Sequence, residues 1–172
     1  MKIEYIKTPL NKYTFSIKPI KEWVEENSTG RVLNLFAGKT KLNLDETRVD
    51  ADETMVADYY MDALDFIQQC KDKFDTIILD PPYAYRKSME MYNGHKASRF
   101  NELKDGLSNL LNENGRVITF GYHSVSMGRG RGFSQEKILL LSHGGAIHDT
   151  IAVVEVKEAK KAILEILKCT NT

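Results

Sequence analysis

Short apolar runs, each ended by a turn residue or a proline, alternate along the chain with segments whose apolar residues recur at helical spacing. The clearest run is Phe74–Asp80, which stops at two prolines, and a similar run over Arg31–Phe36 breaks at an Ala-Gly turn. Helical spacing marks Lys18–Asn27, with Pro19 in its opening turn, and Arg99–Leu111. This alternation predicts an α/β domain with a mostly parallel sheet.

The remaining elements follow from shorter patterns. We predict further strands at Thr47–Asp50, Ala57–Asp62, Arg116–Phe120, Lys137–Leu141 and Thr150–Val156, and further helices at Ala63–Lys71 and Glu158–Cys169. The segment between the last two strands is too short for a helical crossover, which predicts that they are antiparallel neighbours. The length of 172 residues suits a single domain over residues 1–172.

Composition and charge narrow the class of protein. The formal net charge is zero, so binding to nucleic acid has to rest on local basic patches. No apolar run approaches the roughly 18 residues of a membrane span, and the first residues do not resemble a signal peptide, so we expect a cytoplasmic protein without a membrane partner. Cys70 and Cys169 have no neighbouring ligand residues, and no metal site is expected.

Residues suited to bind a nucleotide follow three predicted strands. Gly38 comes after the first strand, where a glycine permits close approach of a ligand to the backbone. Asp50 ends the second strand and could accept both hydroxyls of a ribose, and Asp62 ends the third and could accept from an adenine amino group. A phosphate-binding P-loop is excluded, because Leu33 stands where the first glycine of that motif is required.

The most specific string is Asp80-Pro81-Pro82-Tyr83, directly after the clearest strand. Two prolines stiffen the backbone and remove two N–H donors, so the carbonyl group between them can accept a hydrogen bond from a ligand. The Asp80 carboxylate is a second acceptor beside it, and Tyr83 offers a flat ring. This arrangement favours a planar group that carries an NH₂.

These motifs resemble the amino-methyltransferases, S-adenosylmethionine-dependent enzymes that act on nucleobase NH₂ groups. Asp80–Tyr83 is similar to their catalytic [DNS]PP[YFW] motif, Phe36–Thr40 to their FxGxG cofactor loop, and Ser16–Pro19 to their TxKP segment. The resemblance covers roughly residues 13–122, with the cofactor loop before the catalytic motif. Thr40 replaces the second glycine of the loop, and Asn34 stands where many relatives carry an acid.

The resemblance implies a Rossmann-like class I methyltransferase fold, with a mostly parallel seven-stranded sheet and one antiparallel strand. It implies a catalytic site at Asp80, Pro81, Pro82 and Tyr83. The implied S-adenosylmethionine site is formed by Ser16, Lys18, Leu35, Phe36, Ala37, Gly38, Asp50, Asp62 and Ala63. The expected reaction is methyl transfer to an exocyclic amine of a nucleobase, adenine N6 in DNA or RNA, because Asp rather than Asn at position 80 favours a nucleobase over a protein glutamine.

Two basic segments are candidates for contacts with nucleic acid. The first, residues 84–101, contains Tyr85, Arg86 and Lys87, and the second is a glycine-rich loop with Arg129 and Arg131. Both follow predicted strands, and we expect both on the side of the sheet that holds the site. Nothing after the strand at Arg116 resembles a separate target-recognition domain. The chain therefore suits a structured RNA, a short DNA motif, or target recognition by a partner subunit or a second copy in a homodimer.

Three alternatives remain open at this point. Transfer to a guanine amino group in RNA would use the same chemistry. A non-catalytic methyltransferase-like subunit that binds nucleic acid or a partner would be compatible with Thr40 in the cofactor loop. A nicotinamide-dependent oxidoreductase would require a GxGxxG turn, and Gly38 has no such companions.

Overall fold

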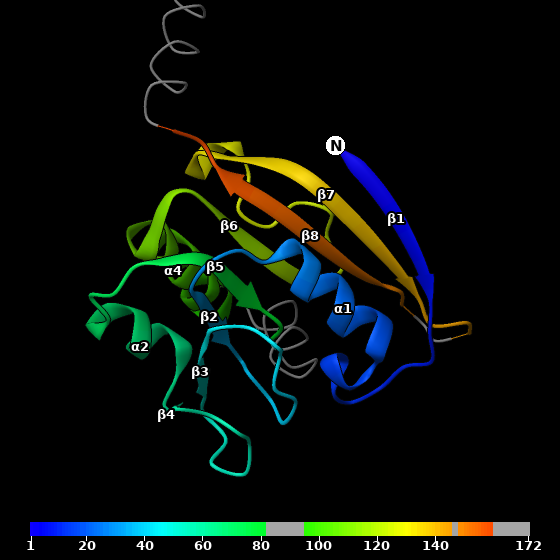
Figure 1. Ribbon diagram of the computed structural model, residues 1–172. Coiled ribbons are helices and arrows are strands. Elements are labelled where there is room, and N and C mark those ends of the chain that lie inside the picture. Colours follow the sequence, from blue (N-terminus) through cyan, green and yellow to red (C-terminus); the bar gives the residue numbers. More distant parts are fainter. Residues whose placement is uncertain (82–94, 146–147, 160–172) are drawn as a thin grey trace, which may run out of the picture.

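The computed structural model describes residues 1–81, 95–145 and 148–159, and these residues form one central sheet with helices on both faces (Figure 1). The strands are β1 (Lys2–Lys7), β2 (Val32–Leu35), β3 (Glu46–Asp50), β4 (Tyr59–Tyr60), β5 (Phe74–Leu79), β6 (Leu111–Gly121), β7 (Phe133–Ser142) and β8 (Thr150–Lys157). The helices are α1 (Lys18–Asn27), α2 (Ala63–Gln69) and α4 (His95–Leu110), with 3-10 turns η1 (Thr14–Ser16) and η2 (Arg129–Arg131).

The strand order in the sheet is β1-β7-β8-β6-β5-β2-β3-β4. Only β8 runs against its neighbours, since it pairs antiparallel with β6 and β7 while the other described pairs are parallel. The prediction of a mostly parallel sheet with one antiparallel strand is therefore confirmed. The described sheet has eight strands rather than seven, because β1 is added beside β7 at the edge.

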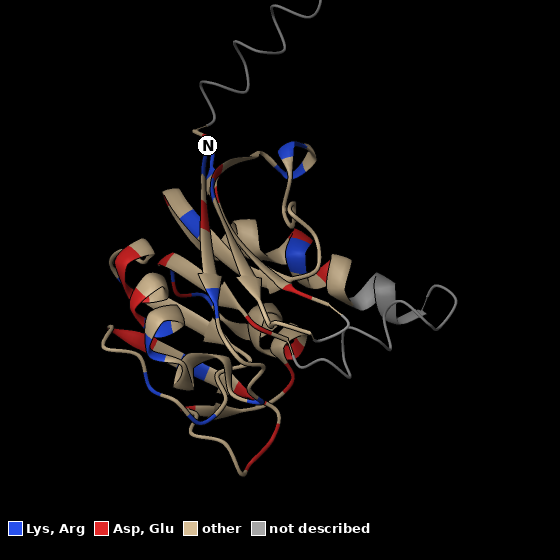
Figure 2. Ribbon diagram, turned by 90° about the vertical axis from the view of Figure 1, so that its right-hand side faces the viewer, with Lys and Arg blue, Asp and Glu red and all other residues tan. Residues whose placement is uncertain are grey.

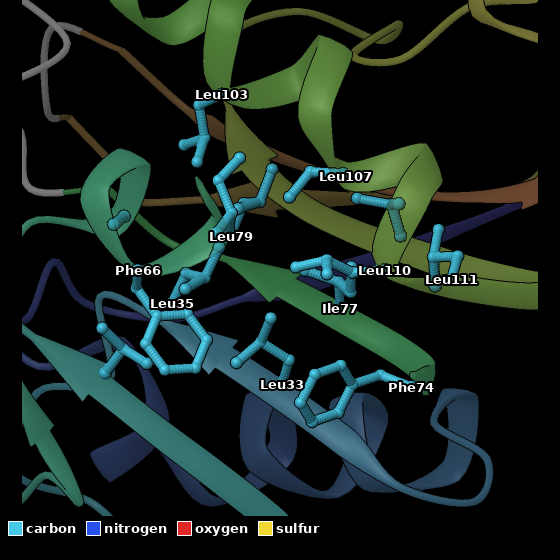
Figure 3. Packing of buried hydrophobic residues seen from close by; sticks show 14 of the residues in the cluster. Leu33, Leu35, Phe66, Phe74, Ile77, Leu79, Leu103, Leu107, Leu110 and Leu111 are labelled. Atoms are coloured by element: carbon cyan, nitrogen blue, oxygen red, sulfur yellow. The ribbon is translucent and has the colours of Figure 1, made fainter. Parts of the chain in front are cut away.

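Two apolar layers hold the sheet between its helices. Alternate residues of the central strands point to opposite faces, as the pleat of a β-strand requires. On one face Leu33, Leu35, Ile77 and Leu79 pack under α2 and α4, and Figure 3 shows Phe66, Leu103 and Leu107 meeting them from these helices. On the other face, α1 packs against the central strands. The residues of this contact are Ile20, Trp23 and Val24 of α1 and Val32, Ile78, Ile118 and Phe120 of the sheet. The carboxyl ends of the parallel strands therefore lie at one edge of a rigid core.

Several predicted elements differ from the structure at their ends. The helix over Lys18–Asn27 is confirmed. The strand predicted over Ala57–Asp62 pairs only at Tyr59 and Tyr60, both of which are exposed, because it lies at the sheet's edge. The first strand, β1, was not predicted. The closing helix predicted from Glu158 to Cys169 lies almost entirely outside the described residues.

The path of the connection between β6 and β7 corrects the predicted position of the loop with Arg129 and Arg131. The first residue of β7, Phe133, pairs with Lys157 at the end of β8. The neighbouring residue of β8, Val156, pairs with Arg116 in β6. The chain therefore returns from the carboxyl end of β6 to its amino end before β7 starts, and η2 lies at that amino end (the yellow turn at the start of β7 in Figure 1). Our expectation that the loop with Arg129 and Arg131 lies on the side of the site is wrong, because β8 and not β7 is the antiparallel strand.

Candidate functional site

A cavity of about 570 Å³ opens at the carboxyl ends of β2, β3 and β5. This is the edge at which open α/β sheets bind their ligands, and the volume lies within the range of roughly 300–1,000 Å³ typical of small-molecule sites. The predicted site residues that line it are Phe36, Ala37, Gly38, Asp50, Asp62, Ala63, Asp80 and Pro81. Residues that are more than forty positions apart in the sequence thus meet in one cavity.

The predicted cofactor loop after β2, Phe36–Thr40, has an unusual backbone. Phe36 and Gly38 adopt left-handed conformations, with φ of 66° and 61°. For a residue with a side chain this conformation costs about 1–2 kcal/mol, and non-glycine residues that adopt it cluster at functional sites. The Asp50 carboxylate accepts a hydrogen bond of 2.9 Å from the N–H of Gly38 and another of 3.0 Å from the N–H of Asp52. Asp50 thus fixes the loop and lines the cavity at the same time.

The glycine at position 38 is required by its backbone angle and not by lack of space. A Cβ built there would have no heavy atom within 4 Å, but φ is +61°. We therefore expect Gly38→Ala to lower the free energy of unfolding by about 1 kcal/mol, measured by urea denaturation. Gly130→Ala is the matched control, since Gly130 also has open space around its Cα but no positive φ. Equal effects of both substitutions would contradict this explanation.

Arg48 was not predicted from the sequence as a site residue. Its side chain forms hydrogen bonds to the backbone of the predicted cofactor loop. The side chain is 2% exposed, and the residue lies in the middle of β3. The guanidinium group donates to the backbone carbonyls of Ala37 (3.0 Å), Gly38 (3.0 Å), Thr40 (2.9 Å) and Val56 (2.6 Å). It also forms an ion pair of 2.6 Å with Glu46. The contacts with Ala37, Gly38 and Thr40 join the loop to the sheet.

Glu46 extends this buried network to β2. One carboxylate oxygen accepts from the N–H of Leu42 at 2.9 Å, and the other accepts from the side-chain amide of Asn34 at 3.0 Å. An acid at position 34 would place a second carboxylate against Glu46 in a buried site, which is strongly unfavourable. Asn34 is thus explained by Glu46, which supplies the carboxylate from the neighbouring strand. The signal in the sequence was the Glu46–Arg48 spacing, which puts both side chains on one face of a strand.

Asp62 and Ala63 lie at the start of α2. The Asp62 carboxylate accepts a 2.9 Å hydrogen bond from the N–H of Leu64 and so caps the helix. Both residues line the cavity, across from the cofactor loop. On the exposed rim nearby, hydrogen bonds from the hydroxyl and backbone N–H of Thr54 hold the pKa of Asp52 below its usual value, so this carboxylate is ionised at neutral pH.

The predicted catalytic motif begins where β5 ends. Asp80 is half-buried and Pro81 is buried, and both line the same cavity as Gly38, Asp50 and Asp62. Pro82 and Tyr83 lie outside the described residues, as do Tyr85, Arg86 and Lys87. The described half of the motif therefore faces the predicted cofactor residues.

Three predicted cofactor residues do not line the cavity. Leu35 is fully buried in the sheet. The Ser16 hydroxyl donates to the carbonyl of Tyr13 at 2.7 Å, and Lys18 is exposed and lies 3.7 Å from Glu22. From the same segment, the cavity is lined instead by Thr14, Phe15 and Ile17.

The cavity has a further wall at the ends of β7 and β8. His143 lies between Thr8 and Thr150, with Nδ1 3.2 Å from the Thr8 carbonyl and Nε2 2.9 Å from the Thr150 hydroxyl. A carbonyl oxygen only accepts, so Nδ1 carries a proton. His143 and Thr150 line the cavity, and no sequence motif pointed to them.

Neither a metal site nor a membrane helix emerges from the described ranges. Within residues 1–81, 95–145 and 148–159, no three His, Cys, Asp or Glu side chains gather as a metal ion requires. In that same part of the chain, every helix is too short or too polar to span a bilayer. Cys70, at the end of α2, is a free thiol.

Comparison with known proteins identifies the fold. The sequence matches no protein-family model and no curated protein. Among solved structures, TrmN from Thermus thermophilus is similar with a TM-score of 0.61 and 17% identity over 86% of this chain, which spans 50% of the TrmN chain. A 1,6-didemethyltoxoflavin-N1-methyltransferase from Burkholderia thailandensis, with bound S-adenosylhomocysteine, is similar with a TM-score of 0.60 and 11% identity over 85% of this chain and 80% of its own.

The N-methyltransferase NodS from Bradyrhizobium japonicum WM9 is similar over 84% of this chain and 99% of its own, with a TM-score of 0.58 and 10% identity. These similarities and the strand order define the chain's architecture as the Rossmann-like methyltransferase fold, with β1 as an additional edge strand. The fold class predicted from the sequence is confirmed.

Proposed function

We propose that this chain binds S-adenosylmethionine in the cavity and transfers its methyl group to an exocyclic amino nitrogen of a nucleobase, adenine N6 in DNA or RNA. The observation that carries the proposal is the single cavity that Gly38, Asp50 and Asp62 share with Asp80 and Pro81. Gly38, Asp50 and Asp62 suit the binding of a nucleoside. Asp80 and Pro81 suit the binding of an amine. The names of two structural neighbours, both N-methyltransferases, support nitrogen as the acceptor atom.

The residues present fit this cofactor. Asp50 has carboxylate lone pairs left for ribose hydroxyls beyond those that accept from Gly38 and Asp52. Asp62 and Gly38 both line the cavity. We infer that Asp62 accepts from the adenine amino group and that Gly38 lets the ligand approach the loop backbone. When bound, the cofactor supplies an activated methyl group on a positively charged sulfonium. The carboxylates that line the cavity favour that charge.

The chain's own contribution to the transfer is to orient the amine. The lone pair of a nucleobase amine is delocalised into its ring, which makes the nitrogen a poor nucleophile. We infer that the Asp80 carboxylate and the Pro81 carbonyl accept the two amine hydrogens and so favour the tetrahedral nitrogen whose lone pair points at the methyl group. The methylated nitrogen then releases one of its two hydrogens as a proton, for which the Asp80 carboxylate is an acceptor. The acceleration comes from positioning and electrostatics and not from a strong base. A target in a duplex would first have to be flipped out of its stack.

The test measures binding and transfer separately. Calorimetric titration with S-adenosylmethionine is expected to show one site per chain. Transfer of a tritiated methyl group to mixed DNA and RNA is then expected to label one of the two pools, and nuclease digestion of that pool to give N6-methyladenosine or its deoxy form. Label in a guanine nucleoside would reassign the acceptor. Cofactor binding without label in either pool would contradict the nucleobase acceptor, and no cofactor binding would favour the non-catalytic subunit.

A further inference from the structure

The cavity proposed as the active site is lined by acidic side chains, which oppose the binding of a negatively charged nucleic acid. Four carboxylates line it, from Asp50, Asp52, Asp62 and Asp80. They suit a sulfonium cofactor, but they repel the phosphates of an approaching strand. In the view of Figure 2, Lys and Arg positions are interspersed with Asp and Glu positions along the described ribbon.

Of the basic residues that the sequence suggests for contacts with nucleic acid, the two in the described part of the chain do not lie at the cavity. Arg129 and Arg131 lie at the amino end of β7, the far end of the sheet. Arg131 is also held by Asp105, at 2.6 Å. Among the described residues that line the cavity, the lysines are Lys12 and Lys39, and both are exposed.

Lys12 and Lys39 come from separate segments and meet at one aromatic ring. Lys12 belongs to the connection between β1 and η1, and Lys39 belongs to the cofactor loop. Their ammonium nitrogens lie 5.4 and 5.6 Å from the centroid of the Tyr13 ring. Tyr13 itself lines the cavity and is partly exposed. The rim thus presents a flat ring with a cation from each of the two segments.

The backbone at Tyr13 is fixed before any ligand binds. Its N–H donates to the side-chain oxygen of Asn11 at 2.9 Å, and its carbonyl accepts from the Ser16 hydroxyl at 2.7 Å. A backbone that is already ordered loses little conformational entropy on binding. Aromatic faces beside basic groups are the usual elements that hold single-stranded nucleic acid without reading its sequence.

We propose that Lys12, Tyr13 and Lys39 form a nucleic-acid-binding rim, in which the two ammonium groups hold phosphates beside the target nucleotide and Tyr13 stacks on an adjacent base. This inference rests on the proposed function, because it requires a nucleic-acid acceptor. It also gives the connection between β1 and η1 a role in substrate binding. The rim offsets the carboxylates of the cavity at the point where the strand enters.

The experiment compares Lys12→Gln/Lys39→Gln with the wild-type chain and with Lys41→Gln. Lys41 is an exposed lysine two positions further along the same loop, and it does not line the cavity. Fluorescence anisotropy measures the Kd for short fluorescein-labelled single-stranded RNA and DNA of mixed sequence at several salt concentrations. Calorimetry measures the Kd for S-adenosylhomocysteine with the same preparations.

For the double variant we expect the Kd for the oligonucleotide to rise about 25-fold at 0.1 M salt, and the slope of log K against log[salt] to become shallower by about 1.4. The Kd for S-adenosylhomocysteine is expected to stay within about twofold, which corresponds to less than ~0.5 kcal/mol. Lys41→Gln should leave the Kd and the salt slope near their wild-type values. Tyr13→Leu should weaken oligonucleotide binding without changing the salt slope.

Each of the other possible results contradicts one stated part of the proposal. If the wild-type chain binds the cofactor product and the oligonucleotide while the double variant binds both equally well, the rim is refuted and the proposed function stands. If the double variant loses S-adenosylhomocysteine instead, the lysines hold the carboxylate of the cofactor's methionine end. If the wild-type chain binds S-adenosylhomocysteine but no oligonucleotide, the rim and the nucleic-acid acceptor fail together, and the methyltransferase assignment remains.

Discussion

Replacing Asp80 with alanine should abolish methyl transfer while S-adenosylhomocysteine still binds with an affinity close to that of the wild-type chain. The expected loss in kcat is about 10²–10³-fold or more, the size measured when one group aimed at the reacting centre is removed. The physical reason is that the amine loses the acceptor that we propose to orient its lone pair, whereas the proposed cofactor contacts of Asp50 and Asp62 are unchanged. Single-turnover transfer of a tritiated methyl group measures the rate, and calorimetry measures binding.

Asp80→Asn is the matched variant for this prediction. It keeps the size of the side chain and one acceptor oxygen, so we expect a smaller loss than in Asp80→Ala. Similar losses in both variants would mean that the charge of Asp80 matters more than its acceptor geometry. Loss of transfer and of cofactor binding together would make Asp80 a structural residue, which would remove the basis of the proposed orientation of the amine.

Replacing Arg48 with methionine should cause the largest loss of stability of any substitution near the cavity. The change leaves the Glu46 carboxylate, 5% exposed, without its ion-pair partner, and it removes the donors to four backbone carbonyls. Breaking a buried pair from one side costs about 3–5 kcal/mol. We expect that loss in the free energy of unfolding, and a rise of roughly tenfold in the Kd for S-adenosylhomocysteine, because the loop must then be ordered on binding.

Two comparisons separate the positioning role of Arg48 from a general loss of stability. Arg116 is a partly buried arginine far from the cavity, which donates to the carbonyl of Asn27 at 3.1 Å. Arg116→Met should lower stability but leave the Kd for S-adenosylhomocysteine unchanged. Adding Glu46→Gln to Arg48→Met should restore part of the stability, because the uncompensated charge is gone, but not the affinity. Affinity that follows stability in all these variants would refute a specific role of Arg48 in positioning the loop.

The elements predicted well from the sequence are those whose local pattern and burial agree. Pro19 at the start and apolar residues at helical spacing determine α1, and continuous apolar runs determine β2 and β5, which are buried in the centre of the sheet. The edge strands behave differently. β1 carries exposed Ile3 and Tyr5, and its pairing with β7 and the contact of Glu4 with Trp23 hold it in place. Apolar and polar residues alternate from Lys2 to Tyr5, as in a strand, but this pattern does not specify which strand β1 pairs with.

The candidate site divides in the same way. The sequence by itself determined the strand-end residues Gly38, Asp50, Asp62 and Asp80, because parallel strands bring their carboxyl ends to one edge and turn chemistry marks those ends. Only the tertiary structure decided what surrounds them. The length and direction of the return from β6 placed Arg129 and Arg131 at the far end of the sheet. Arg48 is buried, and its side chain therefore holds the backbone of the predicted cofactor loop. The added strand β1 leads into the segment that brings Lys12 and Tyr13 to the rim of the cavity. These outcomes depend on contacts between segments distant in the chain, and local patterns carry no information about such contacts.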